Sequence, residues 1–69
     1  MSRLLERLAP GSPPLRMHEL ADLTGFSTEY FRKLREAGSL VVVVAPGGTE
    51  RRVPVQEAER IARDLRLID

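Results

Sequence analysis

The stretch MHELADLTGFSTEYFRKLREAGSL, residues 17–40, determines the fold that we predict for this chain. Apolar residues recur at helical spacing in residues 17–24 and again in residues 28–37. Only Gly25-Phe26-Ser27 separates the two expected helices. Because a turn this short with a glycine in it is typical of two helices that pack at a steep angle, the stretch predicts a helix-turn-helix.

The residues at the ends of these helices support the same interpretation. Gly25 and Gly38 follow the two segments, where a helix C-terminus favours a residue that tolerates positive φ. Ser27 is placed to cap the second helix with its hydroxyl group. We expect Phe31 and Leu34 to face inward, so that the polar residues of the second helix remain on its surface.

A β-hairpin and a last helix are expected after this stretch. The β-branched residues of 40–45 predict a strand, 46–49 a turn and 50–53 a return strand. Pro54 can open the last helix, because its missing N–H would have no partner in the first turn. Apolar residues then recur at three- and four-residue intervals, at Val55, Ala58, Ile61, Ala62, Leu65 and Ile68.

The N-terminal segment is expected to be a short helix on a stiff linker. Residues 2–9 carry leucines at helical spacing, with Ser2 as a possible N-cap, and the prolines and glycine of 10–14 end the helix. We therefore divide the chain into a helix and Pro/Gly linker, 1–14, and a main domain, 15–69. The expected fold class is mainly α with a small β-hairpin (α+β).

The four consecutive valines of the expected hairpin need a covering surface. Strand alternation would send two of the residues 41–44 to the core and two outward. Either the N-terminal helix, through Leu4, Leu5 and Leu8, or a partner would cover the outward pair. We favour the N-terminal helix.

Length and composition exclude several classes of protein. Sixty-nine residues allow one small domain. The chain has no cysteine and one histidine, so disulfides, thiolate metal sites and a structural zinc site are not expected. Its apolar runs are far shorter than the ~20 residues that span a membrane, and we expect no export leader. We expect a cytoplasmic protein, associated with the nucleoid if it binds DNA.

Catalysis is difficult to build from these residues. The single histidine, His18, has no evident serine partner, and Glu57 and Glu59 should point in different directions on a helix. The turn 46–49 lacks the lysine of a phosphate-binding loop, and the chain is too small to bury a substrate. We expect no enzyme, with no catalytic, cofactor-binding or metal-binding residues.

The charge distribution is more informative than its sum. The net charge is +1, but the basic residues gather in two clusters, Arg32-Lys33-Arg35 and Arg51-Arg52. Ten of the eleven cations are arginine, the side chain suited to bidentate contacts with phosphate and guanine. The alternative for the first cluster is a solvated helix face on which Glu29–Lys33 and Arg32–Glu36 pair at i,i+4.

Residues 15–61 resemble the winged helix-turn-helix domains of phage and plasmid excisionases and of the MerR superfamily. The matching stretches are MHELADLTGFS (17–27), TEYFRKLREAGSL (28–40) and RRVP (51–54). The proline that usually follows Gly-x-Leu is replaced by valines, and the N-terminal helix is an addition. The resemblance implies double-stranded DNA as a partner, with 28–37 in the major groove and the wing near the minor groove or the backbone.

The candidate DNA-binding residues combine the resemblance with the outward face of the second helix. Residues near the N-terminus of a recognition helix reach base edges, where arginine or lysine donates to guanine and glutamate accepts from cytosine. Hydroxyl groups there can bind phosphate. Arg51 and Arg52 should point to opposite faces of a strand, so one of the two can reach DNA, and Tyr30 is more often a packing residue. The candidates are Ser27, Thr28, Glu29, Tyr30, Arg32, Lys33, Arg51 and Arg52.

The resemblance leaves more than one function open. It implies an excisionase-like factor that organises DNA for recombination, or a small transcriptional regulator, with an integrase or recombinase or further copies of the chain as possible partners. MerR regulators usually continue into a long dimerisation helix, so within that superfamily we would expect this chain to act only as a minimal repressor or activator. The alternative from another class is a protein-interaction module of a phage or mobile element. Apolar anchors on the face of 28–36 would indicate that alternative, whereas polar and basic residues indicate DNA binding.

Overall fold

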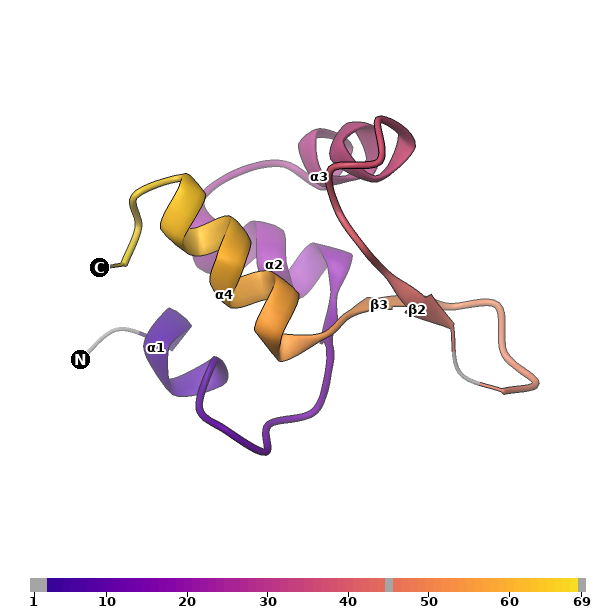
Figure 1. Ribbon diagram of the computed structural model, residues 1–69, viewed down its shortest axis with the longest axis horizontal. Coiled ribbons are helices and arrows are strands. Elements are labelled where there is room, and N and C mark those ends of the chain that lie inside the picture. The colour runs from indigo at the N-terminus through magenta and orange to yellow at the C-terminus, as the bar shows by residue number, and fades with distance from the viewer. Residues whose placement is uncertain (1–2, 45, 69) are drawn as a thin grey trace.

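The computed structural model describes residues 3–44 and 46–68, which form four helices and a three-stranded antiparallel sheet (Figure 1). The molecule measures 35 × 25 × 17 Å, with α1 at one end of the long axis and the loop between β2 and β3 at the other. Within the described residues, no helix is long and apolar enough to cross a membrane. The elements are α1 (Arg3–Arg7), β1 (Leu15–Arg16), α2 (Met17–Thr24), α3 (Thr28–Glu36), β2 (Val43–Val44), β3 (Arg51–Val53) and α4 (Val55–Asp64).

The turn between α2 and α3 forms as the sequence predicts. Gly25 has a φ of 81° and donates its N–H to the Ala21 carbonyl at 2.9 Å, which ends α2. The Thr24 hydroxyl is buried and donates to the Leu20 carbonyl at 2.7 Å. Ser27 caps α3, because its Oγ accepts the Tyr30 N–H at 3.1 Å. These local bonds hold the start of α3 in place.

The end of α3 is equally well defined. Gly38 has a φ of 78°, and its N–H donates to the Arg35 carbonyl at 3.0 Å. The Ser39 N–H donates to the Leu34 carbonyl at 2.8 Å. This pair of bonds is a Schellman motif, which stops the helix at Glu36, one residue before the predicted end.

The sheet has β3 at its centre, flanked by β1 and β2. The short strand β1 was not predicted; it pairs Leu15 with Val53 and Arg16 with Arg52. Because side chains alternate along a strand, Arg51 shares a face with Val53, which is fully buried in the core. Arg52 lies on the opposite face.

The prediction of a strand over residues 40–45 was wrong in its extent. β2 contains only Val43 and Val44, and Ala45 lies outside the described residues. Leu40 is turned into the core with 3% of its surface exposed. The Val41 N–H donates to Glu57 Oε2 on α4 at 2.7 Å instead of joining a strand. The burial of Leu40 and the hydrogen bond from Val41 to α4 therefore take the place of the first part of the predicted strand.

The prediction for the valines was also wrong. Val41, Val43 and Val44 are 61%, 44% and 50% exposed, and only Val42 packs against the core. The N-terminal helix does not cover them, because α1 lies at the other end of the molecule (Figure 1). No element of the described chain therefore covers the side chains of Val41, Val43 and Val44.

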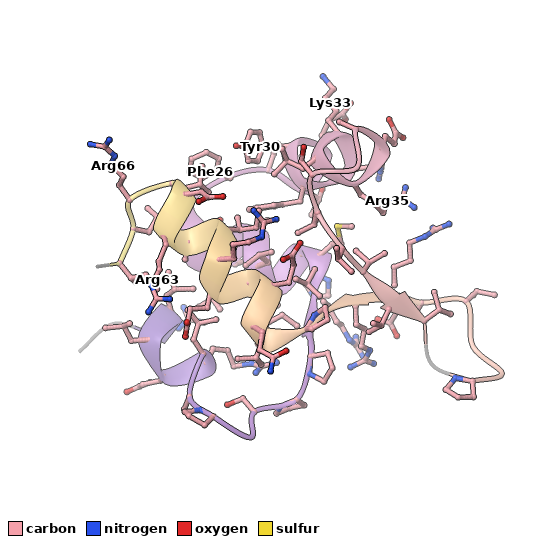
Figure 2. All side chains as sticks on the ribbon, in the orientation of Figure 1. Phe26, Tyr30, Lys33, Arg35, Arg63 and Arg66 are labelled. Atoms are coloured by element: carbon pink, nitrogen blue, oxygen red, sulfur yellow. The ribbon has the colours of Figure 1, made fainter. Side chains whose placement is uncertain are left out.

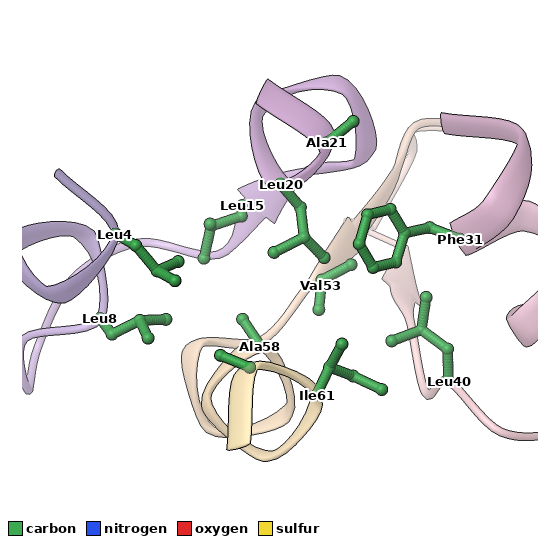
Figure 3. Packing of buried hydrophobic residues seen from close by; sticks show 11 residues of the cluster. Leu4, Leu8, Leu15, Leu20, Ala21, Phe31, Leu40, Val53, Ala58 and Ile61 are labelled. Atoms are coloured by element: carbon green, nitrogen blue, oxygen red, sulfur yellow. The ribbon is translucent and has the colours of Figure 1, made fainter. Parts of the chain in front are cut away.

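The core lies between α1, α2, α4 and the inner sides of α3 and β3 (Figure 3). Leu4 and Leu8 join it, each worth about 1.5–3 kcal/mol when fully buried, while Leu5 remains 55% exposed. The helix α1 is shorter than the predicted 2–9, and Ser2 lies outside the described residues. The buried apolar residues are Leu4, Leu8, Leu15, Leu20, Ala21, Phe31, Leu40, Val53, Ala58, Ile61 and Ala62.

Candidate nucleic-acid interface

The helix α3 carries two polar stripes on either side of its exposed surface. Phe31 is fully buried and fixes the rotation of the helix. Residues spaced by three and four share a face of a helix. Thr28, Arg32 and Arg35 therefore form one stripe, and Glu29, Lys33 and Glu36 form the other. In Figure 2, Lys33 points away from the body of the protein, whereas Arg35 points from α3 toward the hairpin.

The first stripe faces the strand β3 across a cleft. Met17, Thr28, Arg32, Arg35 and Arg51 line this space, which has a volume of about 210 Å³. We call it the arginine cleft. No acidic residue lines it. Arg51 of the second basic cluster thus meets Arg32 and Arg35 of the first, and this depends on Arg51 lying on the core-facing side of β3.

The other arginine of the strand, Arg52, is placed differently. Its Nη2 donates to Glu50 Oε2 at 3.2 Å, and Arg16 Nε lies 3.1 Å from Glu50 Oε1. Glu50 therefore bridges the two arginines on the face of the sheet opposite Arg51. The expectation that Arg51 and Arg52 point to opposite faces is confirmed.

Most arginines outside this region are held in ion pairs. Arg7 binds Glu19, Arg60 binds Glu57 and Asp64, and Arg63 binds Glu59. In residues 3–44 and 46–68, the cations without an ion pair are Arg3, Arg32, Lys33, Arg35, Arg51 and Arg66. Four of these six belong to α3 and β3. The cationic groups available to a partner are therefore concentrated there.

The alternative of a self-paired helix face is not seen. Glu29 and Lys33, and likewise Arg32 and Glu36, have the i,i+4 spacing that favours an ion pair. Neither pair forms in the part of the chain that the structure describes. The charged side chains of α3 thus have no ion-pair partner among the described residues.

Two predicted site residues have local roles in the fold. Ser27 is occupied as the cap of α3. Tyr30 is half-buried, and its ring packs against Phe26 and Phe31 with centroid distances of 4.8 and 5.3 Å. Together with Leu34, it lines the groove between α3 and α4, away from the arginine cleft. The interpretation of Tyr30 as a packing residue is confirmed.

A clamp on α4 that the sequence did not reveal holds the segment between α3 and β2. Arg60 Nη2 donates to the Ser39 carbonyl at 2.7 Å, and Glu57 accepts both the Val41 N–H and the Arg60 guanidinium. The hydrogen bond from Arg60 holds the pKa of Glu57 below its ordinary value, and the bond from Val41 adds to this. The Glu57–Arg60 clamp thereby fixes how the hairpin leaves α3.

Arg35 is the residue that our list of candidates omitted. It is half-buried, and its Nε is buried with no hydrogen-bond partner in the described residues. Two signals could have found it: the seven-residue spacing from Thr28 and the strand alternation that separates Arg51 from Arg52. Combining them requires knowing that β3 lies beside α3, which sequence periodicity does not provide.

Comparison of the chain with protein-family models, with curated proteins and with solved structures found no match. No group of three or more His, Cys, Asp or Glu side chains that could hold a metal ion occurs in residues 3–44 and 46–68. The geometry and charge of α3 and β3 are therefore the observations on which a functional proposal rests.

Proposed function

We propose that this protein binds double-stranded DNA as a winged helix-turn-helix, with α2 and α3 as the helix pair and the β2–β3 hairpin as the wing. The observation that carries the proposal is the gathering of Arg32, Lys33, Arg35 and Arg51 without acidic partners. Such cations are available to bind phosphate, because no internal ion pair must be broken first.

In the proposed complex α3 enters the major groove and the hairpin lies over the adjacent minor groove or backbone. The stripe of Glu29 and Lys33 points outward and would meet base edges, lysine donating to guanine and glutamate accepting from cytosine. Arg51 would meet the backbone. Arg52, held by Glu50, would contribute less than Arg51.

The biological role that we propose is excisionase-like. The resemblance in residues 15–61 suggests a factor that organises DNA for recombination, or a small regulator of transcription, and no enzymatic activity. A domain of this size makes few contacts, so specific binding would require adjacent copies or a recombinase as a partner. Its place would be in the cytoplasm with the nucleoid.

The proposal is tested by titrating the protein against a labelled duplex at several salt concentrations. Four or five phosphate contacts predict a slope of log K against log salt of about −3 to −5. The duplex should be one selected from a random pool by the protein itself, with a scrambled duplex as the control. An affinity that does not depend on the salt concentration, or no binding at low salt, would refute the proposal.

The same titration tests which residues read the bases. Lys33→Gln should reduce the preference for the selected duplex over the scrambled one by about tenfold, because a good base contact is worth about 1–3 kcal/mol. Arg66→Gln, which removes an equal charge from an unpaired arginine outside the site, should leave the preference unchanged. An equal loss for both variants would contradict the role of α3.

A second candidate function is that of a protein-interaction module. The exposed side chains of Val41, Val43 and Val44 favour it, because they lie on an edge strand and on the segment before it. Sedimentation of the protein alone and with DNA would separate the two candidates. Association that disappears in Val43→Thr and needs no DNA would support the interaction module.

A further inference from the structure

The arginine cleft has a composition that suits one kind of ligand. It is lined by three arginines, Arg32, Arg35 and Arg51, together with Thr28 and the apolar residue Met17. Like charges gathered around a cleft repel one another unless an anion lies among them. The guanidinium fork matches the oxygens of a phosphate with two parallel hydrogen bonds.

The Nε of Arg35 gives an independent indication of a missing acceptor. It is a buried donor with no partner among the described residues. Buried donors of this kind are rare in folded proteins, because each forfeits the hydrogen bonds that water would supply. The cleft that Arg35 lines contains no carboxylate to balance its charge. An anion in the cleft would offset the charge of a guanidinium group whose Nε forms no hydrogen bond within the described residues.

The size of the cleft agrees with a small anion. Its volume of about 210 Å³ leaves room for an anion of the size of a phosphate. A nucleobase or a larger planar ligand would find no aromatic residue in the lining to stack on.

We propose that the arginine cleft binds one phosphate of the DNA backbone, with Arg35 as its central ligand. This inference rests on the proposed function. A helix in the major groove and a hairpin over the neighbouring minor groove must have one DNA strand between them, and the cleft occupies that space between α3 and β3. Arg32, Arg35 and Arg51 then fix the register on the duplex, and reading the bases is left to the Glu29 and Lys33 stripe.

The first arm of the test uses inorganic phosphate and no DNA. The arginine Nε–Hε signals are followed by NMR as sodium phosphate replaces sodium chloride at constant ionic strength. The signals of Arg32, Arg35 and Arg51 should move in a saturable way, and those of Arg60 and Arg66 should not. In Arg35→Lys, the signals of Arg32 and Arg51 should no longer saturate. A linear drift of all arginine signals would overturn the proposal of a built site.

The second arm uses duplexes in which one phosphate at a time is replaced by an uncharged methylphosphonate. For the wild type, one position should lower affinity by about tenfold or more, since a charge-assisted hydrogen bond is worth about 1.5–3 kcal/mol. In Arg35→Gln the same replacement should have no further effect. In Lys33→Gln, the same replacement should lower the affinity by the same factor as in the wild type.

The outcomes separate this inference from the proposed function. A saturable phosphate site in a protein that does not bind DNA would leave the anion site standing but refute its assignment to the DNA backbone. DNA binding with additive losses for Arg35→Gln at every phosphate position would refute the cleft and leave DNA binding intact. If Arg35→Gln lowers the melting temperature, Arg51→Gln repeats the second arm from an exposed strand residue.

Discussion

The helices α3 and α4 are similar in length and in the number of charged residues, but they use their charges differently. On α4, Arg60 binds Glu57 and Asp64, and Arg63 binds Glu59 at i,i+4. On α3, acids and bases stand at the same spacing, yet no ion pair forms among the described residues. Charge on α4 is used within the protein, whereas charge on α3 is available to a partner.

The difference shows why counting charges on a helix does not identify an interface. Surface ion pairs at i,i+4 are worth only about 0.3–0.5 kcal/mol, so spacing alone leaves the choice between pairing and exposure open. Whether a charged side chain forms an ion pair depends on its tertiary neighbours. Arg60 is held by the backbone at Ser39 as well as by its acids, whereas Arg35 turns toward the cleft that Arg51 shares.

We expect the largest effect from a substitution in the core beneath α3. Phe31→Ala deletes a fully buried ring under α3 and should lower the free energy of unfolding by about 3–5 kcal/mol. For a domain of this size that is most of the stability. Circular dichroism during urea unfolding would measure it. A variant that keeps its wild-type midpoint would mean that α3 does not depend on this core.

The second largest effect is expected at the arginine cleft, where the arginines have no ion-pair partner among the described residues. The double variant Arg35→Gln/Arg51→Gln should lower duplex affinity by at least about tenfold and the salt slope by about 2, because two phosphate contacts are lost. Its stability should stay the same or rise slightly, since like charges are removed. The matched control, Arg3→Gln/Arg66→Gln, has the same net charge. An equal drop in affinity for both would mean that only overall charge matters.

The third effect concerns the clamp on α4. Glu57→Ala removes the acceptor of the Val41 N–H and should cost about 1 kcal/mol of stability. It should also weaken DNA binding indirectly, because the hairpin loses its anchor. Glu59→Ala breaks an exposed pair with Arg63 and should change the unfolding free energy by less than about 0.5 kcal/mol. Equal changes in the unfolding free energy of the two variants, measured in urea, would show that the Glu57–Arg60 clamp does not stabilise the fold.

The smallest effect is a dependence of stability on pH. Hydrogen bonds from Arg60 and Arg7 hold the pKa of Glu57 and Glu19 below their ordinary value of 4.5. Each group therefore stabilises the fold above the unfolded-state pKa, and this contribution is lost as pH falls through the lower folded-state pKa. Stability should be flat from about pH 8 to 5 and fall below about 4.5. Glu57→Gln should make that acid limb shallower; an unchanged limb would contradict the shift.

The sequence predicted the helices better than the strands, for physical reasons. Apolar periodicity and the caps at Gly25 and Ser27 act locally, so α2 has the predicted bounds and α3 differs by one residue. The strand β1 is two residues long and exists only because β3 lies beside it. The predicted valine strand was too long because Leu40 is buried and Val41 binds α4, which are tertiary effects.

The candidate site could be predicted only in part. The sequence identified both basic clusters, since they are contiguous, and the opposite orientation of Arg51 and Arg52 follows from strand alternation. It did not select Arg35 as a site residue, and it did not reveal the acidic bridge from Glu50 to Arg16 and Arg52. Both depend on the register between strands and on the packing of β3 near α3, and nothing in the periodicity of a single segment encodes that distance.

The central claim is that the free charge of α3 and β3, rather than that of α4, meets DNA. Amide chemical-shift mapping with a selected duplex tests it most directly. We predict that the perturbed amides lie in residues 28–36 and 51–53, while the outer face of α4 around Glu59 and Arg63 stays unperturbed. Perturbations centred on α4 or on the groove between α3 and α4, or none at low salt, would contradict the account.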